Sequence, residues 1–341
     1  MQLEVIQTET EWGTIVDEWN QLLKESITHV PFLRHEYLTA WWKHRGGGEW
    51  PESTLYIIAA RGNDGRLLGA APIFLSKNHA GESALFLIGS IEISDFLDII
   101  VREDDLDIFL DAILAHLTGP DGPDWSSLEW YNLLETSNTL SGIKNLASKY
   151  DLLFHQERTQ PAPIITLPSD FDEYLASLDN RYRRELQRKI RNAMGYFIPV
   201  EWYDVEDENS LENEINDFIL MMREEEEKDV FLTEEMVSQF HAIAQTALQA
   251  GWLKLSFLMV GKEKAAGYFN FDYDDRIWVY NSCIARKFGQ LSPGIVLMGL
   301  LIQDSIKEGR KEFDLMRGDE EYKYHLGGQD RFIVHATVKR K

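Results

Sequence analysis

Carboxylate and phenol side chains gather in residues 313–324, near the C-terminal end of the chain. Asp314 and Asp319 supply carboxylates and Tyr322 supplies a phenol, the kinds of group that transfer protons in acid–base catalysis. Apolar and polar residues alternate until Gly318, which predicts a short strand that ends in a turn. Loops at strand ends often carry the chemistry of open α/β sheets. A solvated turn at the start of a surface helix would show the same residues.

Two cations, Arg317 and Lys323, lie in the same stretch. They can bind an anionic or polar substrate. They can equally pair with Asp314 or Asp319 and hold the turn together. The sequence leaves both roles open.

A second candidate site leads from an expected strand, residues 277–285, into an expected helix, residues 293–308. Ser292 is a favourable N-cap, and the proline that follows suits the first helical position. A helix N-terminus offers unpaired N–H groups and the positive end of a dipole, which hold phosphate oxygens. Charge and close backbone approach are available just before the helix from Arg286, Lys287 and Gly289.

The corresponding helix in the first half of the chain begins within residues 102–106, which contain three acids. These acids suit the helix dipole but would repel a phosphate. A nucleotide-like cofactor is therefore expected in the second half only.

Residues 171–190 are expected to form one amphipathic helix, with Ser169 and Asp172 as a capping box. Its outer face is basic, since residues 181–191 carry six positive side chains and one acid. Such a face can be solvated and pair with acids elsewhere. It can also be an anion clamp that binds substrate through side chains such as Arg184 and Arg188.

The composition is acidic, with a net charge of -23 at pH 7. This charge argues against general affinity for DNA or anionic membranes, because both are bound through clustered Lys and Arg. The single cysteine, Cys283, excludes an internal disulfide and is expected to be a small buried hydrophobe. The histidines show no ligand spacing, so no metal site is expected. Without a signal peptide or an apolar run of membrane-spanning length, we expect a cytoplasmic protein.

The chain contains an internal repeat at an offset of about 200 residues. Residues 32–42 resemble 231–241, and residues 56–75 and 256–271 both read as strand, turn and strand. The order helix, helix, hairpin, strand, helix, strand recurs in both halves. We expect an α/β fold of the α+β type, with mixed sheets, built as a tandem duplication with domains at residues 1–160 and 161–341.

The tandem order, together with residues 292–294, 313–315, 317–319 and 322–323, resembles the CelD-like acetyltransferases of the GNAT superfamily. These enzymes are often associated with cellulose or exopolysaccharide biosynthesis and are related to the Fem-type peptidoglycan aminoacyltransferases. The resemblance covers nearly the whole chain. It implies acyl transfer from acetyl-CoA or another acyl-CoA to an amine or hydroxyl of a sugar, nucleotide sugar or amino acid.

The resemblance also implies roles for individual residues. Tyr322 would protonate the leaving thiolate, and backbone N–H groups around Asn281 to Ile284, a range that includes Cys283, would polarise the thioester carbonyl. The diphosphate would bind the loop formed by Arg286, Lys287, Gly289, Ser292 and Gly294. Candidates for the base are Asp95, Asp314 and Asp319, with Asp98 as a further base candidate and substrate-binding residue. The loop departs from the superfamily pattern at Leu291, which stands where Gly or Ala is usual.

Two alternatives remain open. Fem-type relatives take their acyl group from aminoacyl-tRNA; the net charge disfavours tRNA, but the basic face of residues 181–191 offers a surface for one RNA stem. The second alternative is a non-catalytic module on the same scaffold that binds a polysaccharide or a protein. No residue pattern identifies the acceptor or the oligomeric state.

Overall fold

The computed structural model describes residues 1–50 and 52–341, which divide into two compact units. Unit 1 comprises residues 1–160 together with 332–341, and unit 2 comprises residues 161–331. The boundary near residue 160 was predicted. The last ten residues, however, were assigned to the second domain by the sequence and lie in unit 1, because they form a strand of its sheet.

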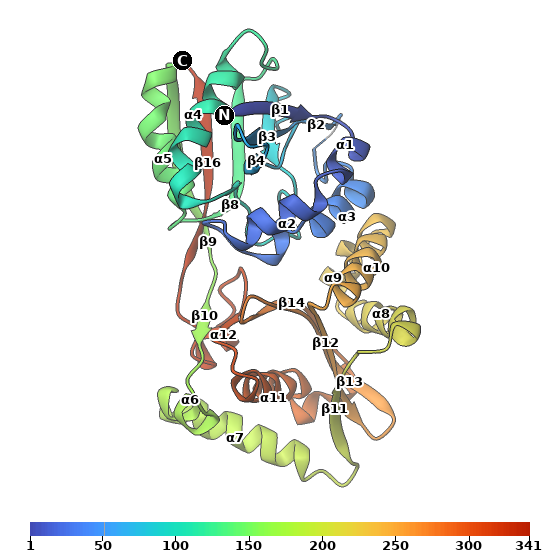
Figure 1. Ribbon diagram of the computed structural model, residues 1–341. Coiled ribbons are helices and arrows are strands. Elements are labelled where there is room, and N and C mark those ends of the chain that lie inside the picture. The colour runs from blue at the N-terminus through green and yellow to red at the C-terminus, as the bar shows by residue number, and fades with distance from the viewer. Residues whose placement is uncertain (51) are drawn as a thin grey trace. The chain divides into compact units, whose positions relative to one another are not determined.

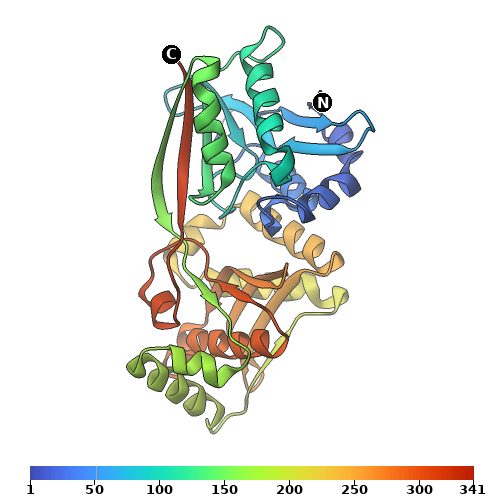
Figure 2. The ribbon, with the colours of Figure 1, turned by 60° about the vertical axis from the view of Figure 1, so that its left-hand side comes forward.

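Unit 1 contains five α-helices among the described residues, namely α1 (Glu9–Gly13), α2 (Val16–Lys24), α3 (His35–Arg45), α4 (Leu106–Thr118) and α5 (Asn138–Ala147). Its strands are β1 (Gln2–Ile6), β2 (Thr54–Leu55), β3 (Ile57–Arg61), β4 (Leu67–Ala71), β5 (Ile73–Lys77), β6 (Ser83–Leu87), β7 (Ile100–Val101), β8 (Ser127–Leu134), β9 (Leu152–Pro161) and β16 (Phe332–Arg340). They form a sheet in the order β1-β3-β4-β7 and another in the order β2-β5-β6-β8-β16-β9. Figure 2 shows β16 running beside β9.

Unit 2 has the helices α6 (Phe171–Ser177), α7 (Asn180–Met194), α8 (Glu208–Met222), α9 (Glu226–Phe231), α10 (Glu234–Gln249), α11 (Pro293–Lys307) and α12 (Glu321–His325). Its strands are β10 (Ile164–Thr166), β11 (Val200–Asp204), β12 (Leu253–Val260), β13 (Glu263–Tyr273), β14 (Arg276–Ile284) and β15 (Glu312–Asp314). They form one sheet in the order β10-β15-β14-β13-β12-β11. The predicted mixed α/β fold is confirmed, and the predicted order of helices, hairpin, strand, helix and strand occurs in both units.

Helices cover both faces of the unit 2 sheet (Figure 1). Phe269 of β13 meets Phe218 of α8 and Phe240 of α10 edge-on, with ring centroids 6.0 Å and 5.7 Å apart. The neighbouring Tyr268 instead lies with its hydroxyl 3.3 Å from the carbonyl oxygen of Gly294 in α11. Since successive strand residues point to opposite faces, α8 and α10 cover one face and α11 covers the other.

Strand β14 continues well past the end of β15. The two strands pair in parallel only from Arg276 to Trp278, where Trp278 lies opposite Asp314. Strand β14 continues to Ile284 in antiparallel pairing with β13, past a bulge at Tyr280. Within the described strands, residues 279–284 have no pairing partner in β15, so this edge of β14 is open.

The open edge presents backbone groups of alternate residues. Ala285 follows the last residue of β14, and its amide donates to the carbonyl oxygen of Ala265 in β13 at 3.0 Å. Because backbone groups alternate in direction along an antiparallel strand, Cys283 directs its amide and carbonyl toward β13. Ser282 and Ile284 therefore direct theirs toward the open edge.

Two local predictions were wrong. The expected helix 171–190 is broken between α6 and α7, because Asp179 caps a new helix by accepting a hydrogen bond from the amide of Arg181 at 2.8 Å. The first cap is Asp170, which accepts from the amide of Glu173 at 2.8 Å; the expected capping pair of Ser169 and Asp172 does not form.

Within residues 1–50 and 52–341, no helix is both long enough and apolar enough to cross a membrane.

Candidate active site

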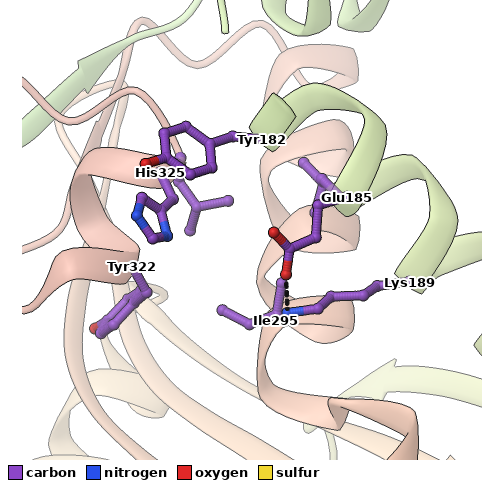
Figure 3. Close-up of a pocket in the computed structure, with 8 residues that line it drawn as sticks. Tyr182, Glu185, Lys189, Ile295, Tyr322 and His325 are labelled. Atoms are coloured by element: carbon purple, nitrogen blue, oxygen red, sulfur yellow. Dashed lines mark ion pairs between the residues drawn. The ribbon is translucent and has the colours of Figure 1, made fainter. Parts of the chain in front are cut away.

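A pocket of about 170 Å³ lies between α7, α11 and α12 in unit 2 (Figure 3). It is lined by Tyr182, Glu185, Leu186, Lys189, Ile295, Tyr322, His325 and Leu326. Ligand sites for drug-sized molecules usually measure a few hundred Å³ or more, so this pocket can enclose one end of a large ligand. Its walls combine the start of α11 with the phenol predicted as the catalytic acid.

Tyr322 is held at this pocket by α12, the short helix that follows β15. Burial raises the pKa of its phenol far above the usual range, so the hydroxyl keeps its proton at neutral pH. Burial also raises the pKa of Tyr268, and Tyr322 adds to that rise. Tyr268 lies on the face of the sheet that α11 covers, with its hydroxyl 3.3 Å from the carbonyl oxygen of Gly294, and the next residue of α11, Ile295, lines the pocket with Tyr322.

Helix α11 begins beside the same pocket. Ser292 occupies the N-cap position and Pro293 the first helical position, as predicted. However, Ser292 has a φ of 51°, and among the described residues its hydroxyl accepts no capping hydrogen bond from the first turn. The serine was expected to cap the helix with its side chain; the turn it adopts leaves the positive end of the helix dipole without that cap.

The two glycines of the predicted diphosphate loop differ in their surroundings. A Cβ added to Gly289 would meet no atom of the described residues within 4 Å, so the backbone there faces open space. A Cβ added to Gly294 would lie 2.7 Å from Cδ1 of Ile284. Gly289 can thus let a ligand approach its backbone, whereas Gly294 is needed for the packing of α11 on β14.

The two predicted cations of this loop are exposed at its start. Lys287 forms an ion pair with Glu263, and the backbone amide of Arg286 donates to Glu224 at 2.9 Å. Both side chains lie in solvent at the start of the short helical turn Arg286–Leu291, which leads into α11.

Asn281 and Cys283 lie on β14, as predicted, but in different environments. The side-chain oxygen of Asn281 accepts a hydrogen bond from the amide of Ser282 at 2.9 Å, on the open edge. The thiol of Cys283 lies 4.0 Å from the sulfur of Met221 in α8, and burial raises its pKa. Cys283 therefore packs as a buried apolar side chain, and its backbone faces β13.

Two residues of the 313–324 stretch form a buried polar network. Asp314 is fully buried and accepts hydrogen bonds from the amide of Met316 at 3.0 Å and from Arg331 at 2.6 Å. Burial raises its pKa, against the opposing effect of Arg331 and Arg276. Lys323 is also buried and donates to the carbonyl oxygens of residues 316 to 318 at 3.2, 2.5 and 3.4 Å. These contacts hold the loop between β15 and α12 and so place Tyr322.

The other predicted site residues within 313–324, Arg317 and Asp319, lie on the loop between β15 and α12. Asp319 is exposed and Arg317 is partly buried. Neither lines the pocket between α7, α11 and α12. The structure thus brings Tyr322 to the pocket and uses Lys323 and Asp314 to hold the surrounding backbone.

The two predicted carboxylates of the first half belong to unit 1. Asp95 is partly buried. Asp98 is fully buried and accepts hydrogen bonds from Ser137 at 2.5 Å, Thr28 at 2.6 Å and the amide of Ile99 at 2.8 Å. With three donors around it, Asp98 ties together distant segments of unit 1.

Helix α7 presents two distinct surfaces. Arg184 and Arg188 are exposed and do not line the pocket. Glu185 and Lys189 do line it, joined by an ion pair of 3.0 Å, and neither was predicted as a site residue (Figure 3). Their spacing of three and seven residues from Tyr182 places them on its side of the helix, a signal available in the sequence.

An aromatic pair closes the pocket at the other end. The rings of Tyr182 in α7 and His325 in α12 stack with centroids 3.8 Å apart and an angle of 22° (Figure 3). The pair links the two helices across the pocket.

The part of the chain that contains the pocket is similar to a known domain family. Residues 180–324 match the acetyltransferase (GNAT) domain family, a range that runs from the start of α7 to Tyr324 in α12. It therefore contains every residue of the pocket except His325 and Leu326. No curated protein sequence matches the chain.

Solved structures share the fold at low sequence identity. FemX is 14% identical, with a TM-score of 0.62 over 100% of this chain and 96% of its own. A conserved protein of unknown function from Bacteroides thetaiotaomicron is 10% identical, with a TM-score of 0.61 over 98% and 100%. The L-PGS from Bacillus licheniformis is 10% identical, with a TM-score of 0.57 over 95% and 91%. Residues 180–324 of the chain thus match the acetyltransferase (GNAT) domain, within a fold that is similar to that of FemX.

Proposed function

We propose that unit 2 transfers an acyl group, with acetyl as the expected case, from acyl-CoA to an amine or hydroxyl of a small-molecule or saccharide acceptor. One observation carries this proposal. Strand β14 runs on past the end of β15 after Trp278, and its open edge ends beside the start of α11, where Ser292 makes no side-chain cap. This opening offers backbone donors to a thioester arm and a helix dipole to a diphosphate.

The residues present fit such a donor. The diphosphate is assigned to the first turn of α11, with Arg286 and Lys287 as exposed cations and Gly289 as the point of close backbone approach. The thioester arm is assigned to the open edge of β14, where the amide of Ile284 points away from β13. A fixed amide near a carbonyl oxygen stabilises the negative charge that develops when the carbonyl is attacked.

Tyr322 is assigned as the acid. When the acceptor attacks the carbonyl carbon, the C–S bond breaks and the thiolate needs a proton. The buried Tyr322 phenol holds its proton at neutral pH and lines the pocket beside α11. Two of the carboxylates predicted as the base, Asp314 and Asp319, lie in unit 2. Asp319 is exposed, whereas Asp314 is buried and already accepts hydrogen bonds from Arg331 and from the amide of Met316.

The resemblance to CelD-like enzymes supports a saccharide acceptor and a role in polysaccharide biosynthesis in the cytoplasm. The test uses the full chain with acetyl-CoA and a panel of amino sugars, nucleotide sugars and amino acids, and follows release of free thiol with a chromogenic disulfide. Saturable thiol release that depends on one acceptor supports the proposal. No binding of acetyl-CoA at millimolar concentration would contradict it.

A second candidate function is aminoacyl transfer from charged tRNA. It is favoured by the exposed face of α7, on which Arg181, Arg184, Arg188 and Arg191 recur at three or four residues. Such a row of guanidinium groups suits a phosphate backbone. The test is a gel shift with tRNA. Binding that weakens steeply with salt, and that is lost in Arg184→Glu/Arg188→Glu, would favour this donor over acyl-CoA.

A further inference from the structure

A lysine of unit 2 touches the open edge of β14. The Nζ of Lys228, in α9, donates a hydrogen bond to the carbonyl oxygen of Ser282 at 2.8 Å. The same Nζ donates to Oε1 of Glu225 at 3.0 Å. The side chain is partly buried, so two contacts with its own chain fix an amine at the edge assigned to the thioester arm.

Lys228 contacts one member of a cross-strand pair whose other member packs against α11, the helix that lines the pocket of the proposed acid. Ser282 lies directly opposite Tyr268 in the register of β14 and β13. The hydroxyl of Tyr268 lies 3.3 Å from the carbonyl oxygen of Gly294 in the first turn of α11, and the next residue, Ile295, lines the pocket together with Tyr322. The amine of Lys228 and the phenol of Tyr322 thus both belong to the part of unit 2 where β14 meets the start of α11.

The two groups come from opposite faces of the sheet. Lys228 belongs to α9, which directly follows α8, and α8 packs on the face that carries Phe269. Tyr322 lies with α11 on the face that carries Tyr268. This is the arrangement that acyl transfer requires, with a nucleophile on one side of the carbonyl carbon and the acid for the leaving group on the other.

We propose that Lys228 is an acyl-acceptor site of the protein itself, so that the chain acylates its own Lys228 Nζ from acyl-CoA. The inference rests on the function proposed above. Glu225 takes a proton from the ammonium group, and the neutral amine forms a C–N bond to the thioester carbonyl carbon. The C–S bond breaks, the second amine proton is lost to solvent, and the thiolate takes the phenol proton of Tyr322, which solvent then restores. The products are an Nε-acyl-lysine and free coenzyme A.

The modification changes the site. An acylated Lys228 carries no positive charge and cannot keep its ion pair with Glu225. Its acyl group remains on the acceptor side of the β14 edge, where an external amine would have to approach. Self-acylation is therefore expected to slow transfer to other acceptors.

The experiment incubates the full chain with acetyl-CoA labelled in the acetyl group, without any acceptor, and locates the label by peptide mass spectrometry. Lys228→Arg keeps a cation beside Glu225 but cannot form the stable acyl-lysine. The matched control is Lys262→Arg, which alters an exposed lysine of the β12–β13 turn. Binding of acetyl-CoA is measured in parallel by tryptophan fluorescence.

The expected result is one label per chain on Lys228, unchanged in Lys262→Arg, lost in Lys228→Arg, and formed about tenfold more slowly or worse in Glu225→Gln. Saturable binding of acetyl-CoA without label on Lys228 overturns this inference and leaves the proposed function standing. Absence of both binding and label overturns both. Equal labelling of Lys228 and exposed lysines would show nonspecific acylation by the thioester and would also overturn the inference.

Discussion

Arg331 donates from Nη2 to Oδ2 of Asp314 at 2.6 Å, which ties the last residue of unit 2 to the end of β15. Asp314 is also the residue at which β14 and β15 cease to pair. The ion pair therefore fixes β15 at the point where the strands part, and the opening proposed as the thioester site begins there.

Replacing Asp314 by Ala should destabilise unit 2 strongly. Removal of the carboxylate takes away the buried counter-charge that Asp314 presents to Arg331 and Arg276, and losing one partner of a buried ion pair costs about 3–5 kcal/mol. Urea unfolding measures the loss. The control is Asp319→Ala, because Asp319 is exposed and its removal should change stability by less than about 0.5 kcal/mol. Equal stability of the two variants would exclude a structural role for the Asp314 pair.

Replacing Tyr322 by Phe should slow acyl transfer about 100-fold while the Kd for acyl-CoA changes little, because a general acid acts on the leaving thiolate and not on binding. The measurements are steady-state thiol release and fluorescence titration. The matched control is Tyr324→Phe on the same helix, where the exposed phenol bonds Asp330 at 2.8 Å. An unchanged kcat in Tyr322→Phe would remove this residue from the mechanism.

The two loop glycines should respond in opposite ways to substitution by Ala. In Gly294→Ala the new methyl would meet Ile284, and such overpacking costs about 1–3 kcal/mol. Gly289→Ala has open space and should fold with wild-type stability but bind acyl-CoA more weakly, because the methyl would stand between the backbone and the diphosphate. Thermal unfolding and fluorescence titration measure the two effects. Wild-type affinity in Gly289→Ala would argue against a diphosphate at this loop.

The buried Asp98 of unit 1 should give the stability a defined pH dependence. Burial raises its pKa in the folded state, against hydrogen bonds from Ser137 and Thr28. Its contribution is therefore fully present below the pKa of the unfolded chain, about 3.9, and is lost as pH rises through the higher folded value. Asn does not titrate, so the stability of wild type relative to Asp98→Asn should fall with rising pH. Urea unfolding of both proteins across this range checks the trend, and a relative stability that rises with pH would contradict it.

Local signals in the sequence predicted many elements, and long-range contacts account for what it missed. Ser292 and Pro293 predicted the start of α11, because preferences at a helix end act within one turn, although the side chain of Ser292 makes no cap. Strand β16 went unpredicted, although residues 332–338 include alternating apolar positions, because its partners β8 and β9 are distant in the chain. The break before α7 was also missed, since the apolar spacing continues across Asp179, whose side chain starts a new helix.

In the candidate site, too, the sequence predicted individual residues but not the long-range contacts between them. Residue type and order identified Tyr322, which the structure places at the pocket. They could not predict that Asp314 pairs with Arg331 or that Lys228 bonds the carbonyl oxygen of Ser282. These partners are distant in the sequence and meet only when the sheet and α9 assemble. Lys323 was ambiguous in the sequence, and its three bonds to the carbonyl oxygens of the loop favour a structural role.

The central claim is that an acyl-CoA thioester binds the opening between β14 and β15 in unit 2. Hydrogen exchange of the full chain with and without coenzyme A tests it most directly. We predict slower exchange in residues 279–296 and in α12, with little change in unit 1. Saturable binding that leaves residues 279–296 unprotected, or that protects unit 1 alone, would contradict the account.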